Sequence, residues 1–64
     1  MYIVVLYTTK GRMYFSGQYI LGVHLKQETY YRDQATLLSA SQADEVGRAY
    51  MRTYGYDFDL ERIS

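Results

Sequence analysis

The most strongly patterned segment of the chain is the apolar run over residues 2–7, Tyr-Ile-Val-Val-Leu-Tyr. Residues 2–9 are predicted to form a β-strand, because they are rich in β-branched and aromatic types. Alternate side chains of a strand point to opposite faces, so Tyr2, Val4 and Leu6 share one face and the intervening residues share the other. Both faces are apolar, and such a strand needs cover on both sides.

A β-hairpin is predicted at Lys10-Gly11, since glycine supplies the positive φ that tight turns need. Residues 12–20 are expected to form the returning strand, on which Met13 and Phe15 alternate with polar side chains. Gly17 interrupts this strand and is expected to mark a bulge or a bend.

Two registers of this hairpin are open. A two-residue loop pairs Leu6 with Phe15, whereas a three-residue loop with a bulge pairs Val5 with Phe15. The second is preferred, because Lys-Gly is a less natural type I′ pair than Asn-Gly. The difference matters, since a slip of one residue changes which face of the first strand meets Phe15.

The middle of the chain is less clearly patterned. Apolar and polar residues alternate over Val23–Lys26, which favours a short third strand within residues 21–31, although its formation stays open. Arg32–Gln34 is polar and predicts a loop or a single helical turn. Ala35–Leu38 is apolar again and is expected to be an extended piece that enters a helix.

One helix is predicted after this segment from apolar positions three and four residues apart. Ser41 is the preferred N-cap, with Asp44 completing a pairing like that of a capping box. Ser39 with Gln42 is the alternative start, and Gly55 is expected to end the helix as its C′ residue. The apolar stripe consists of Ala43, Val46, Ala49 or Tyr50, and Tyr54.

The segment Tyr56–Ile63 alternates between apolar and acidic residues, which predicts a half-buried strand. We expect it to pair with the first strand and so to make that strand central. Residues 1–64 are therefore predicted to form a single small α+β domain. Its antiparallel sheet has three or four strands, including the N-terminal hairpin and the C-terminal strand, and is packed by one helix.

Composition narrows the classes of function. The 64 residues include no cysteine, which excludes disulfides and thiolate metal sites, and the single His24 cannot form a histidine cluster. A chain of this size buries only about 60% of its unfolded surface, so self-association or a partner is the common remaining source of stability. The formal net charge of zero argues against nucleic-acid binding and against attraction to anionic membranes.

No signature of a catalytic, cofactor-binding or metal site is present. Asp57, Asp59 and Glu61 share one strand face, but successive side chains there lie about 6.5–7 Å apart, too far to share one ion easily. A solvated face that keeps an exposed edge from aggregating is preferred, with a basic partner surface as the alternative. The expectation is a protein that is not an enzyme and needs no cofactor.

The N-terminal run lacks the flanks of a signal peptide and is too short to cross a bilayer. We therefore expect a complete chain that acts in the cytoplasm without contact with a membrane.

The layout resembles that of a broad class of very small phage and prophage proteins. The likeness lies in Tyr2–Gly11, a tyrosine-containing strand with a lysine–glycine hairpin, in Ala35–Ala43, which leads into the helix, and in the acidic Gly55–Ile63. The resemblance implies a phage origin and the host cytoplasm. Understood members of this class bind and inhibit, or redirect, a host protein. The resemblance assigns no functional residue.

Nine tyrosines are the outstanding feature of the composition, and tyrosine brings a large amphipathic area to binding surfaces. The helix is expected to cover one face of the sheet and to leave the other open as a protein interface, unless residues 21–38 fold across it. The prediction is a non-enzymatic module that binds a partner protein or forms a homodimer. The less favoured alternative is a single-strand nucleic-acid binder that stacks bases on Tyr14, Tyr19, Tyr30 and Tyr31. The predicted partner-binding residues are Tyr2, Val4, Leu6, Tyr14, Tyr19, Tyr30, Tyr31 and Arg32.

Overall fold

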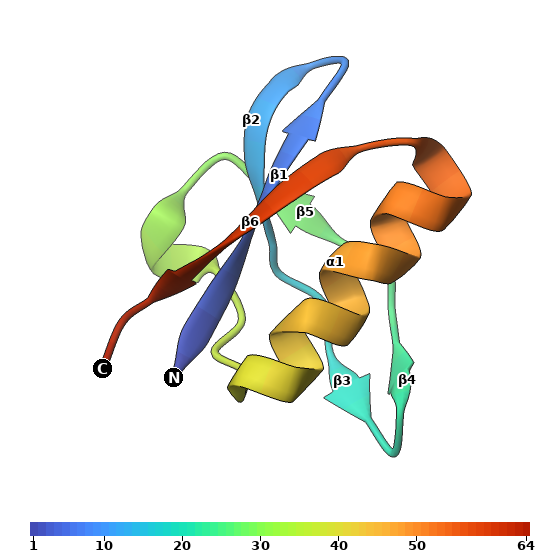
Figure 1. Ribbon diagram of the computed structural model, residues 1–64. Coiled ribbons are helices and arrows are strands. Elements are labelled where there is room, and N and C mark those ends of the chain that lie inside the picture. Colours follow the sequence, from blue (N-terminus) through green and yellow to red (C-terminus); the bar gives the residue numbers. More distant parts are fainter.

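Strand β1 (Tyr2–Thr8) lies at the centre of the fold. In the computed structural model, which describes residues 1–64, it belongs to a four-stranded antiparallel sheet with the order β5-β2-β1-β6 (Figure 1). Its neighbours are β2 (Gly11–Phe15) and β6 (Asp57–Arg62), and β5 (Glu28–Thr29) forms the edge beyond β2. The predicted α+β class is confirmed, as is the pairing of the first strand with the acidic last strand.

Helix α1 (Ala40–Tyr54) packs on the face of the sheet that carries Val4 and Leu6 (Figure 1). Both side chains are fully buried beneath Val46 and Tyr50 of the helix. The prediction that the face of Tyr2, Val4 and Leu6 stays open is therefore wrong, because the helix covers that face. The predicted stripe of α1 is buried at Ala43, Val46 and Tyr50, and its last position, Tyr54, is exposed.

The register of the β1–β2 hairpin explains why the face of β1 that was predicted to stay open is the one that α1 covers. Leu6 pairs with Met13 and Thr8 pairs with Gly11, so the loop is Thr9-Lys10 and both predicted registers are wrong. The hydroxyl of Thr8 donates to the carbonyl of Gly11 and accepts from the N–H of Lys10, which closes the turn one residue earlier than predicted. Phe15 consequently joins the core on the helix side, rather than lying with Val5.

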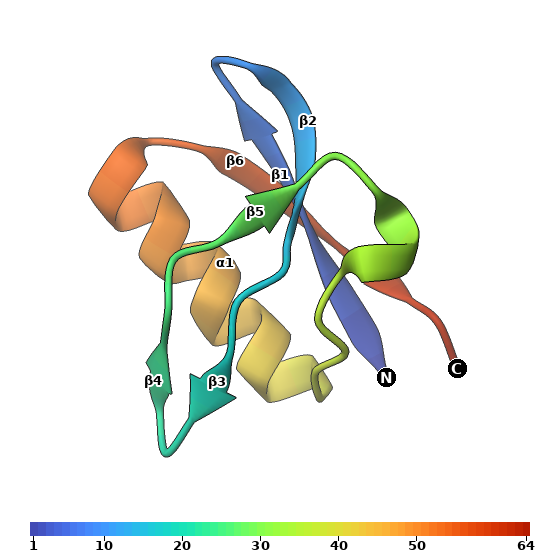
Figure 2. The same ribbon diagram turned by 180° about the vertical axis from the view of Figure 1, so that it is seen from behind.

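The second face of β1 is covered by the chain between β5 and α1 (Figure 2). Ile3, Val5 and Tyr14 form a small buried cluster there, against which Ala35 packs. This covering segment includes the 3₁₀ helix η1 (Arg32–Gln34). Two backbone bonds between Tyr2 and Leu38 and one from Thr36 to Phe15 attach it to the sheet. The observed structure is thus the alternative in which residues from the middle of the chain fold across the sheet.

Residues 16–25 do not continue the returning strand. The chain bends at Gly17 and forms a separate hairpin of β3 (Tyr19–Ile20) and β4 (Val23–His24), which projects from the body beside α1 (Figures 1 and 2). The strand predicted over residues 12–20 is thus too long. The predicted third strand is divided between β4 and β5.

Helix α1 begins with a capping box at Ser39, so the preferred cap Ser41 is wrong and the alternative is right. The Ser39 hydroxyl accepts the N–H of Gln42 at 3.2 Å, and the Gln42 side chain accepts the N–H of Ser39 at 3.1 Å. Gly55 ends the helix as predicted, with a φ of 73°.

Ser39→Ala is expected to lower the free energy of unfolding by about 1 kcal/mol, because it removes the acceptor for one free N–H of the first turn. Ser41→Ala is the matched control and should change stability by less than about 0.5 kcal/mol, since Ser41 caps no N–H. Urea unfolding of both variants measures the difference. Equal effects of the two changes would contradict the cap assignment.

Candidate functional site

The β3–β4 hairpin turns its aliphatic side chains toward solvent. Its two cross-strand pairs are Tyr19–His24 and Ile20–Val23. The first pair faces the body, where the ring of His24 lies 5.8 Å from that of Phe15. The second pair points outward, with Ile20 59% and Val23 65% exposed. The aromatic, polar-tipped pair is thus inside and the aliphatic pair outside, which is the reverse of the usual arrangement.

The tip of this hairpin places a leucine in an unfavourable conformation. Leu21 has a φ of 52° and is followed by Gly22 with a φ of 80°, as in the type I′ turns that favour Asn-Gly. A left-handed conformation costs a residue with a Cβ about 1–2 kcal/mol. Leu21 is also 96% exposed, so its side chain gives the fold almost no packing in return. Strain of this kind at an exposed apolar residue is typical of a functional position.

Four residues form the outward surface that we call the aliphatic tip: Ile20, Leu21, Val23 and Leu25. Leu25 follows Val23 by two residues and is 60% exposed.

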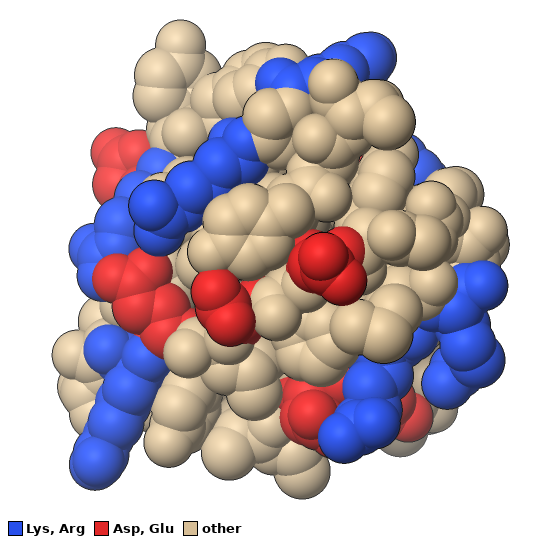
Figure 3. All heavy atoms as spheres, turned by 45° about the horizontal axis from the view of Figure 1, so that its top comes forward, with Lys and Arg blue, Asp and Glu red and all other residues tan.

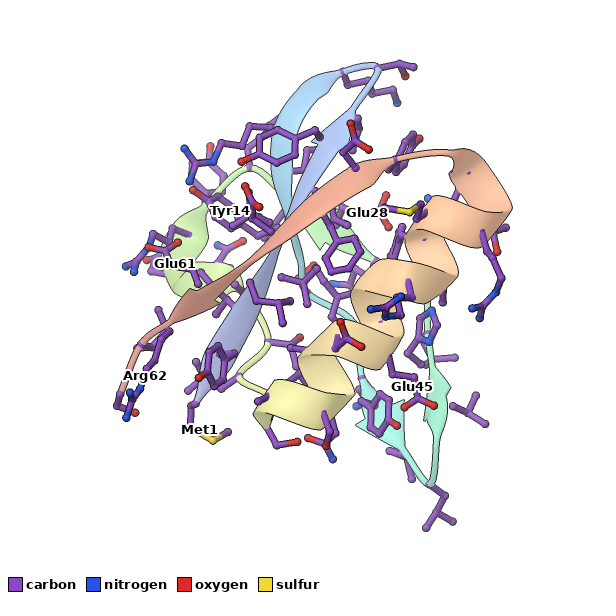
Figure 4. The ribbon with its side chains drawn as sticks, in the orientation of Figure 1. Met1, Tyr14, Glu28, Glu45, Glu61 and Arg62 are labelled. Carbon is purple, nitrogen blue, oxygen red and sulfur yellow. The ribbon has the colours of Figure 1, made fainter.

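The base of the hairpin is held on both strands. The N–H of Leu25 donates to the carbonyl of Gln18 at 2.9 Å. The hydroxyl of Tyr19 donates to Glu45, which reaches the hairpin from α1 (Figure 4). Gly17 lies so close to the other strand that an added Cβ would be 1.9 Å from the carbonyl oxygen of Leu25. The aliphatic tip therefore projects from a fixed base.

A partly buried hydrogen bond connects α1 to β5. The hydroxyl of Tyr50 donates to Glu28 Oε2 at 2.6 Å, and Lys26 Nζ donates to Glu28 Oε1 at 2.9 Å. Burial alone would raise the pKa of Glu28, but these two hydrogen bonds outweigh it and hold the pKa below its usual value. Burial, together with the bond to Glu28, raises the pKa of Tyr50. At neutral pH the pair is thus an ionised carboxylate and a protonated phenol.

Four of the residues predicted to bind a partner belong to the interior. Val4 and Leu6 are fully buried, Tyr2 packs against the same cluster, and Tyr14 is buried on the opposite face. Figure 4 shows Tyr14 on the side of the sheet that also carries Glu61. These four side chains do not form an open surface.

The other predicted residues lie in three different settings. Tyr19 lies on the inner side of the β3–β4 hairpin. Tyr30 and Tyr31 are exposed, and the hydroxyl of Tyr30 donates to the carbonyl of Lys10 at 3.3 Å. The guanidinium of Arg32 donates two hydrogen bonds, of 2.8 and 3.1 Å, to one oxygen of Glu61.

The four tyrosines proposed for base stacking are not brought together. Tyr14 lies in the cluster beneath residues 30–38, and Tyr19 lies in the cluster beneath α1. Only Tyr30 and Tyr31 are neighbours with exposed rings. A row of stacking platforms along one groove, as single-strand binders use, is therefore absent for this set.

Sequence reasoning missed the aliphatic tip because it took Val23–Lys26 as part of a third strand and did not consider a hairpin at Gly22. A signal was present in the sequence. Aliphatic residues flank Gly22 on both sides, and a two-residue turn ending in glycine is a hairpin signal. A hairpin at that point would have placed Ile20 opposite Val23.

No protein-family model matches the chain, and no curated protein or solved structure is significantly similar to it. None of the helices has the length and apolar character needed to cross a membrane. The surface holds no pocket and no group of three metal-ligating side chains.

Proposed function

We propose that this protein is a protein-interaction module that inserts its aliphatic tip into an apolar groove of a partner protein. The observation that carries the proposal is Leu21, a fully exposed leucine held in a left-handed turn. Neither the exposure nor the conformation benefits the isolated fold, so we infer that both serve binding.

The shape of the hairpin favours a groove over a flat partner surface. The hairpin is two strands wide and projects from the body (Figure 1), so a concave site can contact its outward face and its tip together. Complete burial of one aliphatic side chain contributes about 1.5–3 kcal/mol. Four such side chains supply useful affinity only when most of their exposed surface is covered, because association itself costs several kcal/mol.

A second copy of the chain is the less favoured occupant. Two convex tips that meet on a two-fold axis cover only the outward faces of each other. The resemblance to small phage proteins, whose understood members bind host proteins, further supports a foreign partner in the host cytoplasm. The proposal needs no catalytic step and no cofactor.

Leu21→Asn separates binding from folding. It creates the favoured Asn-Gly turn and is expected to raise the free energy of unfolding by about 1 kcal/mol. Because it also removes the central side chain of the tip, it should weaken partner binding at least tenfold, or about 1.4 kcal/mol. Immobilised wild type and variant are compared for the proteins they retain from host extract, and the retained protein is then titrated against each.

Tyr31→Ala is the matched control, since Tyr31 is 65% exposed but lies outside the hairpin. It should leave binding unchanged. Retention of the partner by Leu21→Asn, or its loss with Tyr31→Ala alone, contradicts the proposal. The wild type could instead be a dimer in solution that Leu21→Asn converts to a monomer. That result would show that the tip binds a second copy of the chain and not a foreign protein.

A further inference from the structure

Strand β6 is an outer strand of the sheet, and its far side is unpaired. The N–H of Ile63 donates to the carbonyl of Met1 at 2.8 Å. In an antiparallel ladder, the main-chain groups of alternate residues point to the same neighbouring strand. The residues that turn their N–H and C=O toward β1 are therefore Ile63, Glu61, Asp59 and Asp57. The residues between them turn theirs away from β1, and no other segment of the chain pairs with them. These outward-facing residues are Phe58, Leu60 and Arg62.

The two faces of this open edge differ in chemistry. One face carries Phe58 and Leu60, which are half-buried against the core beneath α1. The opposite face carries three carboxylates, those of Asp57, Asp59 and Glu61. In Figure 3 red carboxylates lie across the middle of the view, with most blue side chains toward its edges.

Two of these carboxylates have no cationic partner. Glu61 is bound by Arg32 at 2.8 Å, but neither Asp57 nor Asp59 forms an ion pair. Asp59 accepts only the hydroxyl of Tyr7, at 2.7 Å, and this hydrogen bond raises the pKa of Tyr7. The negative charge of the edge is therefore uncompensated at the end nearest α1.

A second copy of β6 does not fit this edge. Two-fold pairing in one continuous sheet is antiparallel, and outward-facing residues must meet outward-facing residues. Any register in which two or more of Phe58, Leu60 and Arg62 pair with the same residues of the second copy also brings acidic residues together. An acidic residue of one copy then lies directly opposite an acidic residue of the other. With Leu60 opposite Leu60, for example, Asp59 meets Glu61. Like charges placed directly opposite are destabilising.

We propose that the open edge of β6 binds an extended segment of a partner protein in which Lys or Arg alternates with apolar residues. Such a segment adds a strand to the sheet through the main-chain groups of Phe58, Leu60 and Arg62. Its basic side chains lie beside Asp57 and Asp59, and its apolar side chains lie beside Phe58 and Leu60. This surface is on the opposite side of β1 from β2, the strand that leads into the β3–β4 hairpin.

The probe is a synthetic peptide of about eight residues, the length of a strand, in which Lys and Val alternate. A peptide with Glu in place of Lys is the charge control. Amide exchange measured by NMR is expected to slow at Phe58, Leu60 and Arg62 with the Lys peptide and to stay unchanged with the Glu peptide. Failure to slow at these amides, or equal protection by both peptides, overturns the proposal.

Variants separate strand addition from general attraction between charges. Asp57→Asn combined with Asp59→Asn should weaken the Lys peptide at least tenfold, whereas Asp33→Asn, an exposed acid on η1, should not. Equal weakening by both changes would leave only general electrostatic attraction and would overturn the proposal. Leu21→Asn should bind the Lys peptide as the wild type does, so this test and that of the aliphatic tip fail independently.

Discussion

Gly17→Ala is expected to lower the free energy of unfolding by about 3 kcal/mol, the upper end of the usual range for overpacking. The added Cβ would lie 1.9 Å from the carbonyl oxygen of Leu25 and 3.0 Å from Phe15 Cε1. A side chain can change rotamer to relieve such a contact, but a main-chain oxygen cannot. The clash outweighs the stabilisation of about 0.4–1 kcal/mol that alanine brings by restricting the unfolded chain.

Thermal unfolding measures this effect, and a loss of that size lowers Tm by roughly 12–24 °C in a domain of this length. Gln18→Ala is the control, since the adjacent Gln18 is exposed and should shift stability by less than about 0.5 kcal/mol. Displacement of the base of the β3–β4 hairpin should also move the ring of His24 away from Phe15. The NMR chemical shifts of these two residues report that movement. A Gly17→Ala protein as stable as the wild type would mean that this close approach does not fix the hairpin.

Tyr50→Phe is expected to lower the free energy of unfolding by about 2 kcal/mol at neutral pH, the range for hydrogen bonds to charged groups. The change keeps the buried ring and removes only the hydroxyl that donates to Glu28. Glu28 is left with Lys26 as its one remaining side-chain donor. Tyr56→Phe is the control, because the Tyr56 hydroxyl makes no hydrogen bond within the protein.

The effect of Tyr50→Phe should depend on pH in a defined direction. The folded state holds the pKa of Glu28 below the ordinary glutamate value of 4.5. The ionised carboxylate therefore adds stability above that value, which is lost as the pH falls through the lower pKa of the folded protein. The difference between wild type and variant should shrink as the pH falls from neutrality through 4.5 and below. A difference that stays constant over this range would show that the carboxylate's charge contributes nothing.

The elements that the sequence predicts correctly are those whose pattern is local. The central position of β1 follows from its two apolar faces, and β6 follows from strict alternation up to Glu61. The end of α1 at Gly55 follows from one residue that readily adopts a positive φ. In each case the signal lies within a few residues of the element that it predicts.

The parts that the sequence does not predict depend on contacts between distant segments. The two hydrogen bonds of the Thr8 hydroxyl stabilise a turn at Thr9-Lys10. The conformational preferences of Lys10-Gly11 do not indicate this turn. That shift placed Phe15 beneath the helix. The cover of the second face rests on Leu38 pairing with Tyr2, a contact across most of the chain. The interface predicted on Val4 and Leu6 is wrong because α1 covers the face that carries them.

The aliphatic tip was missed for a different physical reason. Alternation in Val23–Lys26 shows that a strand has two unlike faces, but it does not show which face is buried. Periodicity assumes that apolar side chains face inward, and here His24 and Tyr19 do so instead. A site whose apolar side chains face solvent therefore cannot be found from periodicity under that assumption.

The pairing of β1 with β6 also has a consequence for synthesis of the chain. Tyr2 pairs with Arg62, so β1 leaves the ribosome well before the strand that pairs with it. Until β6 arrives, Val4 and Leu6 lack one neighbouring strand and β1 has an open edge. Contacts so distant in sequence form slowly. Correct folding of the emerging chain therefore requires that β1, its most apolar strand, stays exposed only briefly. A pause in translation before Asp57 would prolong that exposure.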